Sequence, residues 1–411
     1  MKPFVPLNGP RAQTLLAEAG VDGLLAASLE NVYYLCGLWS ENFAILPKQT
    51  QLFAIVSRDD LAAPRLVAGL GEAANIHSFL GLKVRPYLFG TFFRFVSSSV
   101  DLDESERFVK EHVLDGTPFA SVVEAAARAI ADAGLRRSRI AYDERGIFPE
   151  TLAQLQERVP DAEFVPGWHL FRRIRSVKTL EEQRLLTKAV RIAEGAIHAA
   201  MGSARAGMTE QDLTAVYEKA IIDAGARLNF AQIAFGRRGG TGYVMSRDAE
   251  LREDDIIRFD VGCDYMGYHA DIARNFALTP PDARTRDIHA AMVAGQQAAA
   301  EAMRPGVLAR DVFEIGIRAA RDAGVDEYRR HHIGHGLGLE VYDIPVLAPG
   351  DDTELEEGMV ISVETPYYEL GYGWLQPEDA FLVTAGGGEW LNSLSREFEV
   401  WAGGREKGSA A

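Results

Sequence analysis

The chain has 411 residues, 47% hydrophobic and 25% charged, which suits a soluble globular protein large enough for two domains. Its formal net charge of -16 argues against nucleic acid or an anionic membrane as a partner, because a phosphate surface requires a basic face on the protein. The two cysteines, Cys36 and Cys263, form no Cys-x-x-Cys pair, and no apolar run approaches the ~20 residues that span a bilayer. No signal-peptide pattern follows Met1, so we expect a cytoplasmic protein.

Residues 1–170 alternate helical and strand patterns, which predicts an α/β domain. The expected elements are a helix over Pro10–Ala19, a strand over Val21–Ala27, a hairpin of Phe43–Pro47 with Leu52–Ser57, a helix over Phe119–Ala133, a strand over Arg139–Tyr142 and a helix over Thr151–Val159. This domain contains no phosphate-binding loop. The aromatic stretch Phe89–Phe95 is interpreted as core or interface packing, and it is also a candidate for shaping substrate access.

Residues 171–402 form the second predicted domain, and the small, polar residues 403–411 are expected to be a flexible tail. Capping-box patterns at Thr179 and Thr209 begin two helices, and strands follow them. Two further helices, Ala283–Met303 and Ala309–Ala323, again precede strands. The repeated order indicates two related halves folded around one site.

Two aspartates lie on consecutive predicted strands of this domain. Asp260 ends the apolar run of residues 256–260, and Asp271 lies early on a strand predicted over Tyr268–Leu278. A hairpin would bring the two carboxylates together, where they repel each other unless they share a cation. On these residues alone, a pair of capping or turn aspartates remains open as the alternative.

Three later segments favour a metal site. His335 lies among glycines, Glu364 ends an apolar strand that begins at Val360, and Glu378 precedes the strand-like run Ala380–Val383. Oxygen-rich ligands with one imidazole suit a pair of divalent ions such as manganese, cobalt, iron or zinc.

This ordered set of ligands resembles that of the pita-bread metallopeptidases, which include aminopeptidase P, prolidase and methionine aminopeptidase, with creatinase as a relative that is not a peptidase. The resemblance covers about residues 171–400, and residues 1–170 are similar to the extra N-terminal domain of the prolidase and creatinase branch. It implies an α+β fold, with a creatinase-type α/β domain followed by a pita-bread catalytic domain. It also implies a homodimer in which the N-terminal domain caps the active site of the neighbouring subunit.

The resemblance also implies roles for the ligands. Two divalent ions, most simply manganese, would share a water or hydroxide, with Asp271 and Glu378 bridging them. Asp260, His335 and Glu364 would complete the ligand set. Glu364 would in addition accept the proton of the water and pass it on.

Several residues are candidates for contacting the substrate. His331 lies four residues before His335, where aminopeptidase P has a functional histidine, whereas His332 is expected to point elsewhere and to be structural. His269 shares a strand face with Asp271, and a surface position is the alternative. Arg237 and Arg238, among glycines, could hold a substrate carboxylate or could belong to a mobile, solvated loop.

Three positions depart from the family pattern. Tyr342 and Tyr243 stand where the family has histidines, and Gln376 stands where it has an arginine. A phenol can donate a hydrogen bond to a developing oxyanion but is a poor base at neutral pH. We therefore keep both tyrosines as candidate catalytic residues. With tyrosines in place of histidines, the site lacks two groups that could protonate the amine leaving group of a peptide.

Three functions fit these observations. The first is a dinuclear metallohydrolase that cleaves the amide bond next to proline in small peptides, using a metal-bound hydroxide. The second, favoured by the tyrosines, is a non-peptidase metalloenzyme on the same scaffold that acts on a small carboxylate-bearing metabolite, as creatinase, ectoine hydrolase or a sulfoniopropionate lyase does. The third and least favoured is an inactive protein-binding module, because such modules lose ligands and this chain has all five.

Overall fold

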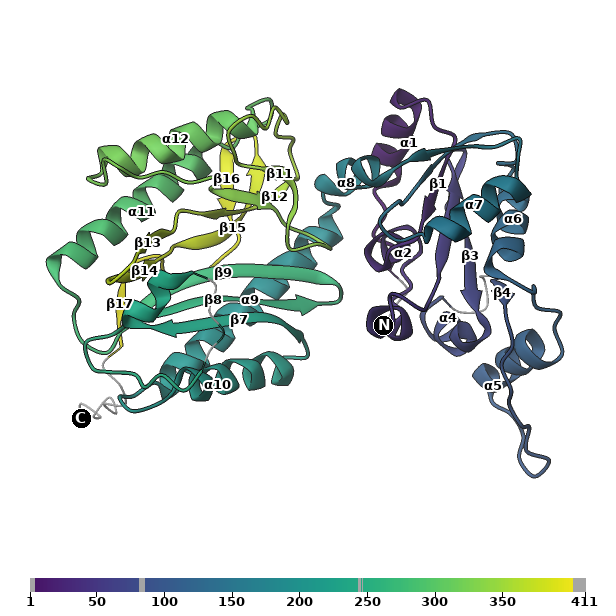
Figure 1. Cartoon of the computed structure of the whole chain (residues 1–411), viewed down its shortest axis with the longest axis horizontal. Helices are drawn as coiled ribbons and strands as arrows, with labels where there is room; N and C mark the ends of the chain where they lie inside the picture. Colours follow the sequence, from purple (N-terminus) through teal and green to yellow (C-terminus); the bar gives the residue numbers. More distant parts are fainter. Residues whose placement is uncertain (1–3, 81–85, 243–244, 246, 402–411) are drawn as a thin grey trace. The chain divides into compact units, whose positions relative to one another are not determined.

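A computed structural model describes residues 4–80, 86–242, 245 and 247–401, and it divides the chain into two compact units, Met1–Arg175 and Ser176–Ala411 (Figure 1). The expected tail over residues 403–411 lies outside the described residues. Among the described helices, none is long and apolar enough to cross a membrane.

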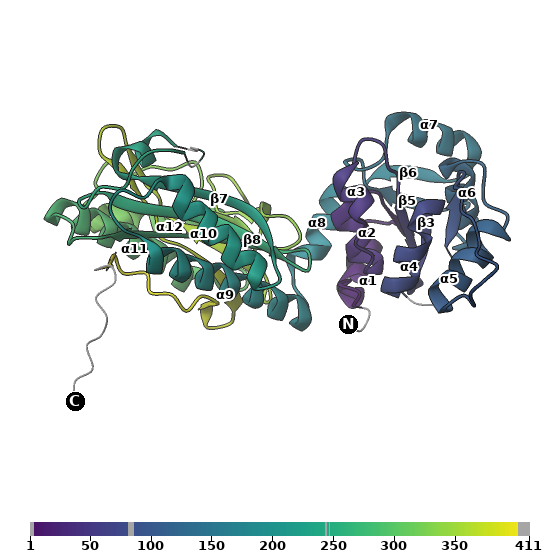
Figure 2. The same ribbon diagram turned by 90° about the horizontal axis from the view of Figure 1, so that it is seen from below.

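The first unit is built on a six-stranded sheet with the order β4-β3-β2-β1-β5-β6. Its strands are β1 (Gly23–Ala26), β2 (Phe53–Ser57), β3 (Asp60–Gly69), β4 (Tyr87–Phe89), β5 (Arg139–Tyr142) and β6 (Glu163–Pro166). Its helices are α1 (Gly9–Glu18), α2 (Leu29–Cys36), α3 (Glu41–Ile45), α4 (Ala73–Leu80), α5 (Glu104–Val109), α6 (Val122–Asp132), α7 (Pro149–Arg158) and α8 (Trp168–Ser176), and they are seen from below in Figure 2. Buried apolar side chains of β1, β2, β3 and β5 pack against α6 and α7 to form the core of this unit.

One expectation for this unit, the hairpin of Phe43–Pro47 with Leu52–Ser57, was wrong. Residues 41–45 form α3 instead of a strand, because the Ser40 hydroxyl accepts a hydrogen bond from the Phe43 N–H at 3.1 Å and so caps a helix. The hairpin partner of β2 is therefore β3. In the aromatic stretch, Phe89 packs against the core of the unit, whereas the Phe93 and Phe95 side chains are almost fully exposed, so a role of these two in an interface or in substrate access stays a prediction.

In its described residues, the second unit contains four long helices that pack on one large sheet. The helices are α9 (Leu180–Ser203), α10 (Glu210–Asp223), α11 (Ala283–Ala302) and α12 (Ala309–Asp322). The predicted capping boxes are both present, with Thr179 bonded reciprocally to Glu182 and Thr209 to Asp212. The strands are β7 (Arg227–Phe235), β8 (Ile256–Tyr265), β9 (Tyr268–Ala277), β10 (Gly334–Gly336), β11 (Asp343–Val346), β12 (Val360–Glu364), β13 (Tyr367–Glu369), β14 (Gly373–Leu375), β15 (Glu378–Thr384), β16 (Gly387–Trp390) and β17 (Glu399–Val400).

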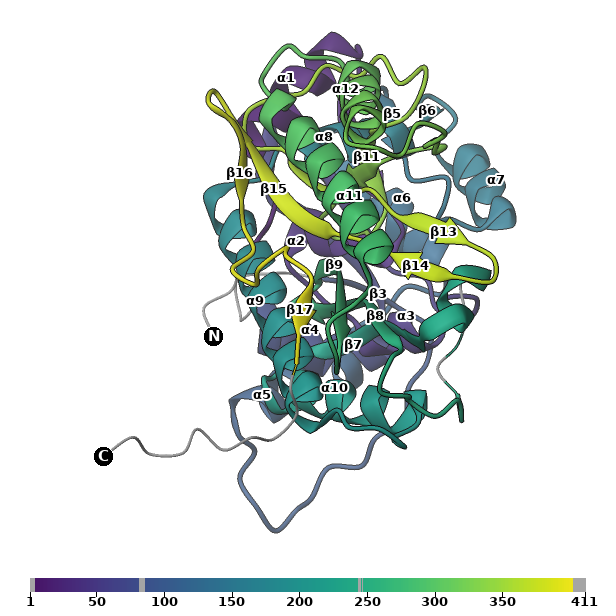
Figure 3. The same cartoon turned by 90° about the vertical axis from the view of Figure 1, so that its left-hand side faces the viewer.

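The two halves of this unit meet in the middle of the sheet. The strand order is β11-β10-β12-β15-β9-β8-β7, so β15 of the second half pairs with β9 of the first, where Glu378 lies opposite Ala273. Helices α9 and α10 pack against β7, β8 and β9, whereas α11 and α12 pack against each other beside β12 and β16 (Figure 3). Two helices followed by strands therefore occur twice, as the sequence predicted.

Candidate metal centre and active site

The five predicted ligands lie on one face of the central sheet. Asp260 on β8 is opposite Ala273 on β9, and Ala273 is two residues from Asp271, so both aspartates project from the same face. Glu364 on β12 is directly opposite Glu378 on β15. His335 on β10 is opposite Ser362, two residues before Glu364, and so shares that face.

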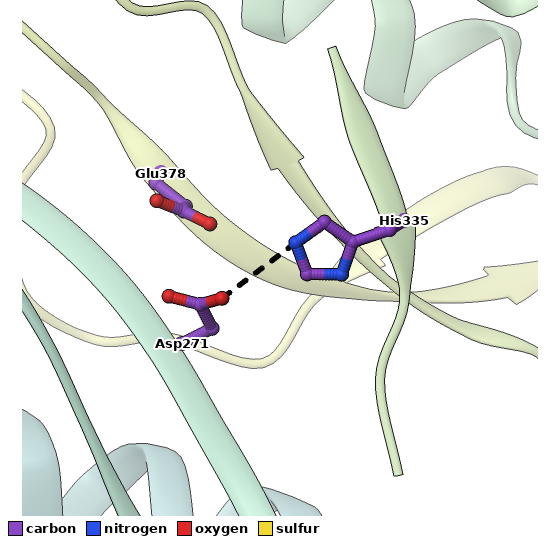
Figure 4. Close-up of side chains that lie close together, drawn as sticks. All are labelled: Asp271, His335 and Glu378. Carbon is purple, nitrogen blue, oxygen red and sulfur yellow. Dashed lines mark ion pairs between the residues drawn. The ribbon is translucent and has the colours of Figure 1, made fainter. Parts of the chain in front are cut away.

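Three of these side chains form a tight, buried group. One ligand atom from each of Asp271, His335 and Glu378 lies within 4.8 Å of the others (Figure 4). His335 Nε2 is 3.6 Å from Asp271 Oδ2 and has no hydrogen-bond partner among the described residues. A buried imidazole nitrogen that points at carboxylates without a hydrogen bond is the arrangement that a metal ion would satisfy. The donor set therefore fits a divalent ion.

The electrostatics of the group support the same conclusion. Burial raises the pKa of Glu364 to about 7 and also raises the pKa values of Asp260, Asp271 and Glu378, the last two well above the ordinary carboxyl range. Burial lowers the pKa of His335 to about 4, so its imidazole is neutral at pH 7 and available as a ligand. Bound divalent cations would favour the ionised carboxylates, which the protein alone disfavours.

Polar side chains hold the two glutamates in place. The Ser362 hydroxyl donates to Glu378 Oε1 at 3.1 Å. The Gln376 amide donates to Glu378 Oε2 at 2.7 Å and to Glu364 Oε2 at 3.3 Å. The Gln376 backbone N–H donates in turn to the Asn275 side chain at 2.6 Å. Gln376 therefore fixes the spacing of two ligands, although the position departs from the family pattern.

A small cavity opens beside the ligands. Its volume is about 170 Å³, and it is lined by Phe230, Gln232, Asp260, Asp271, Val341, Tyr342, Glu364, Tyr368, Gln376 and Glu378. Phe230, Gln232, Val341 and Tyr368 were not foreseen. Gln232 on β7 lies opposite Asp260 on β8, and no local sequence pattern predicts this register.

Comparison with known proteins places this site in a family. Residues 184–385 match metallopeptidase family M24, and residues 10–82 match the creatinase/prolidase N-terminal domain. The probable dipeptidase PepE of Mycobacterium bovis is 30% identical over 397 residues, which cover 95% of this chain and 94% of that protein. The chain belongs to metallopeptidase family M24.

Other relatives agree with this assignment. The Xaa-Pro dipeptidase of Pyrococcus furiosus is 31% identical over 226 residues, which cover 54% of this chain and 65% of that protein. The crystal structure of the X-Pro aminopeptidase from Thermotoga maritima superposes with a TM-score of 0.75 at 21% identity, over 96% of this chain and 99% of that one. The predicted family, the two-part fold and the metallohydrolase class are confirmed.

The histidines near the M24 centre do not lie as the sequence suggested. His332 is buried, and its Nδ1 is 3.3 Å from Glu364 Oε1, whereas an extended segment was expected to turn it away. His331, the candidate for substrate contact, is exposed, and its ring centroid is 4.4 Å from that of His332. Residues 330–333 form no regular strand, so the alternation rule does not apply there. A substrate role for His331 stays a prediction.

The structure describes only one of the two candidate catalytic tyrosines. Tyr342 lines the cavity, and its ring stacks on the imidazole of His335 with centroids 3.6 Å apart and planes at 22°. About half of its side chain remains exposed, so its ring can meet a ligand in the cavity. Tyr243 lies outside the described residues.

The candidate substrate-binding residues also differ from one another. The Arg238 Nε donates to Glu210 at 2.8 Å, and Glu210 is fully buried and accepts two backbone N–H bonds as well. Arg238 therefore has a structural partner, which the sequence did not reveal. Arg237 is exposed on the turn Gly236–Thr241, and His269 is half-buried on β9, two residues from Asp271.

One charged residue at the centre was missed. Arg258 is 1% exposed, its Nη2 contacts Asp260 Oδ2, and its guanidinium lies over the indole ring of Trp374. It lies two residues before Asp260 on β8, so strand periodicity would have placed it on the same face.

Proposed function

We propose that this M24 enzyme hydrolyses the amide bond next to proline in small peptides, and dipeptides above all. The observation that carries the proposal is the set of four carboxylates and one imidazole on one sheet face, beside a cavity of about 170 Å³. A cavity of that size suits a dipeptide better than a long chain. Relatives named Xaa-Pro dipeptidase and probable dipeptidase support the choice of substrate.

The residues around the cavity have distinct proposed roles. Two bound divalent ions would be held by Asp260, Asp271, His335, Glu364 and Glu378, and would polarise the scissile carbonyl and activate a water molecule. Glu364 accepts the proton of the attacking water, because its carboxylate is buried at the edge of the cavity. His332, whose Nδ1 lies 3.3 Å from Glu364 Oε1, is proposed to orient that carboxylate.

Tyr342 stands at the mouth of the cavity and can donate a hydrogen bond to negative charge that develops on the substrate. His331, Tyr243, Arg237 and His269 are proposed to contact the substrate. Arg238 is proposed to act indirectly, by holding the turn that carries Arg237 through its ion pair with a buried glutamate.

We further propose manganese as the metal, a homodimer as the assembly and the cytoplasm as the location. Oxygen-rich ligands with a single imidazole favour a hard or borderline ion, and cobalt, zinc and iron are the alternatives. Both cysteines are buried free thiols, which suits a reducing compartment. Light scattering and metal analysis of the purified protein test the first two points directly.

One observation favours a second function. A phenol, Tyr342, is stacked on the metal-ligand candidate His335 where the family has a histidine, so a base for the amine leaving group is missing at that position. A small amide or another carboxylate-bearing metabolite would then be the substrate in place of a peptide.

The test is release of free amino acid from a panel of Xaa-Pro dipeptides and tripeptides by manganese-loaded protein. We expect metal-dependent turnover that is greatest on dipeptides, and Glu364→Gln serves as the control that keeps the fold. If loaded protein turns over no member of the panel, the peptidase proposal fails, and small carboxylate-bearing amides should be screened instead.

A further inference from the structure

A buried positive charge lies inside the ligand set of this enzyme, on the side of Asp260. Arg258 is 1% exposed, and the one ion pair that the described residues offer it is with Asp260. Its Nη2 also lies 3.5 Å from Gln376 Oε1, and the amide of Gln376 donates to Glu364 and Glu378. The guanidinium is thereby linked to three of the five ligands.

Burying this guanidinium is energetically costly. Arg258 Nε and Nη1 are buried and have no hydrogen-bond partner among the described residues. An arginine is charged at every accessible pH, so this charge cannot be removed by losing a proton. A buried cation with unsatisfied donors destabilises the protein unless nearby anions compensate it.

The charge count shows what Arg258 does to metal binding. In the metal-bound state the four carboxylate ligands are ionised and carry four negative charges, and a neutral imidazole ligand adds none. The positive charge of Arg258 reduces the net charge of the ligand set from minus four to minus three. Binding of one divalent ion then brings the net charge to minus one, and binding of a second brings it to plus one. Without Arg258, two divalent ions would match the ligands completely.

The geometry shows which ion is affected. Asp271, His335 and Glu378 are clustered within 4.8 Å, and among the described residues no hydrogen bond or ion pair joins any of the three directly to Arg258. Asp260 lies outside that cluster, and one of its two oxygens is engaged by Arg258. An ion bound by Asp260 must share this carboxylate with a guanidinium and tolerate its repulsion.

We infer that Arg258, braced by Gln376, is a positioning residue that holds Asp260 and weakens the binding of the metal ion on the Asp260 side. The ion held by Asp271, His335 and Glu378 is little affected. Because Arg258 competes with this ion for the Asp260 carboxylate, the fraction of protein that holds the second ion depends on the concentration of free metal.

The experiment is a calorimetric titration of Mn²⁺ into metal-stripped full-length protein, with bound metal counted by elemental analysis. In Arg258→Met we expect the dissociation constant of the second ion to fall about tenfold or more, and that of the first ion to change by less than about threefold. Arg258→Lys keeps the charge and should retain the wild-type pattern. Arg258→Gln takes the place of the methionine variant if that variant does not fold.

A matched control and an exchange of residues complete the test. Arg274 is a similarly buried arginine on β9 that pairs with Asp379 and donates to the backbone carbonyl of Glu378, but no hydrogen bond or ion pair among the described residues joins it to the five ligand side chains. Arg274→Met should therefore not tighten the binding of the second manganese ion. The exchange Arg258→Gln with Gln376→Arg returns a guanidinium to the same place and should restore weak second-ion binding. The inference is overturned if removing Arg258 leaves second-ion binding unchanged or weaker, or if Arg274→Met tightens it equally. Because the readout is metal binding, the result does not depend on which amide the enzyme cleaves.

Discussion

Burial of Glu364 should make the metal-free protein lose stability as the pH rises from about 4.5 to about 7. The side chain is 5% exposed, and its pKa is raised from 4.5 to about 7, chiefly because burial disfavours the charged form. The folded state therefore holds this proton more tightly than the unfolded state. Below about pH 4.5 both states are protonated, so the loss of stability develops only as the unfolded carboxyl ionises.

The size of the effect follows from the shift in pKa. At about 1.4 kcal/mol per pH unit, the shift corresponds to about 3 kcal/mol of unfolding free energy lost by pH 7. The raised pKa values of Asp260, Asp271 and Glu378 act on stability in the same direction. Two histidines act in the opposite direction, because burial lowers the pKa of His335 to about 4 and that of His332 to about 3. These histidines are protonated mainly in the unfolded state at pH 4–6, so their contribution to stability grows as the pH rises.

A comparison with Glu364→Gln isolates the carboxylate, because the amide has the same shape and does not titrate. Urea unfolding would be measured in chelator at pH 4.5, 5.5, 6.5 and 7.5. We expect the two proteins to be similarly stable at pH 4.5 and the variant to gain about 3 kcal/mol relative to the wild type by pH 7.5. Saturating Mn²⁺ should reverse the order, because the ion stabilises the ionised ligand. A difference in stability that is constant across this pH range would refute the reasoning.

Four further changes test the site. His335→Ala should remove at least one bound metal ion per chain by elemental analysis, since it deletes the only imidazole of the ligand set, and intact stoichiometry would exclude it as a ligand. Tyr342→Phe keeps the stacked ring but loses the hydroxyl, so kcat should fall about tenfold or more with little change in KM, and unchanged turnover would remove the phenol from catalysis. His332→Asn should lower kcat and shift its pH profile, because it alters the environment of Glu364, whereas an unchanged profile would make the histidine structural. Arg238→Met should lower stability by about 2 kcal/mol in chemical unfolding, because it removes a charge-assisted hydrogen bond from a buried carboxylate that two backbone N–H groups still hold, and a rise in KM without that loss would instead assign Arg238 to the substrate.

Local rules were sufficient for much of this protein. Capping boxes at Thr179 and Thr209 predicted where two helices begin, because a cap depends on residues three positions apart. The ligands stood out because a carboxylate beside an apolar strand is costly without a partner, and that signal is visible at Asp260, Asp271, Glu364 and Glu378. Their order along the chain was enough to indicate the family and its fold.

The remaining features depend on contacts between segments that are far apart in the sequence. Arg258 contacts Gln376, which is 118 positions later in the sequence, and Arg238 pairs with Glu210 on the preceding helix α10, so neither pairing leaves a local pattern. His332 rather than His331 faces Glu364, because an irregular segment turns its side chains in a way that periodicity does not describe. Residue types and their order therefore sufficed for the chemistry of the ligands, whereas the charge balance around them was established only when the strands packed together.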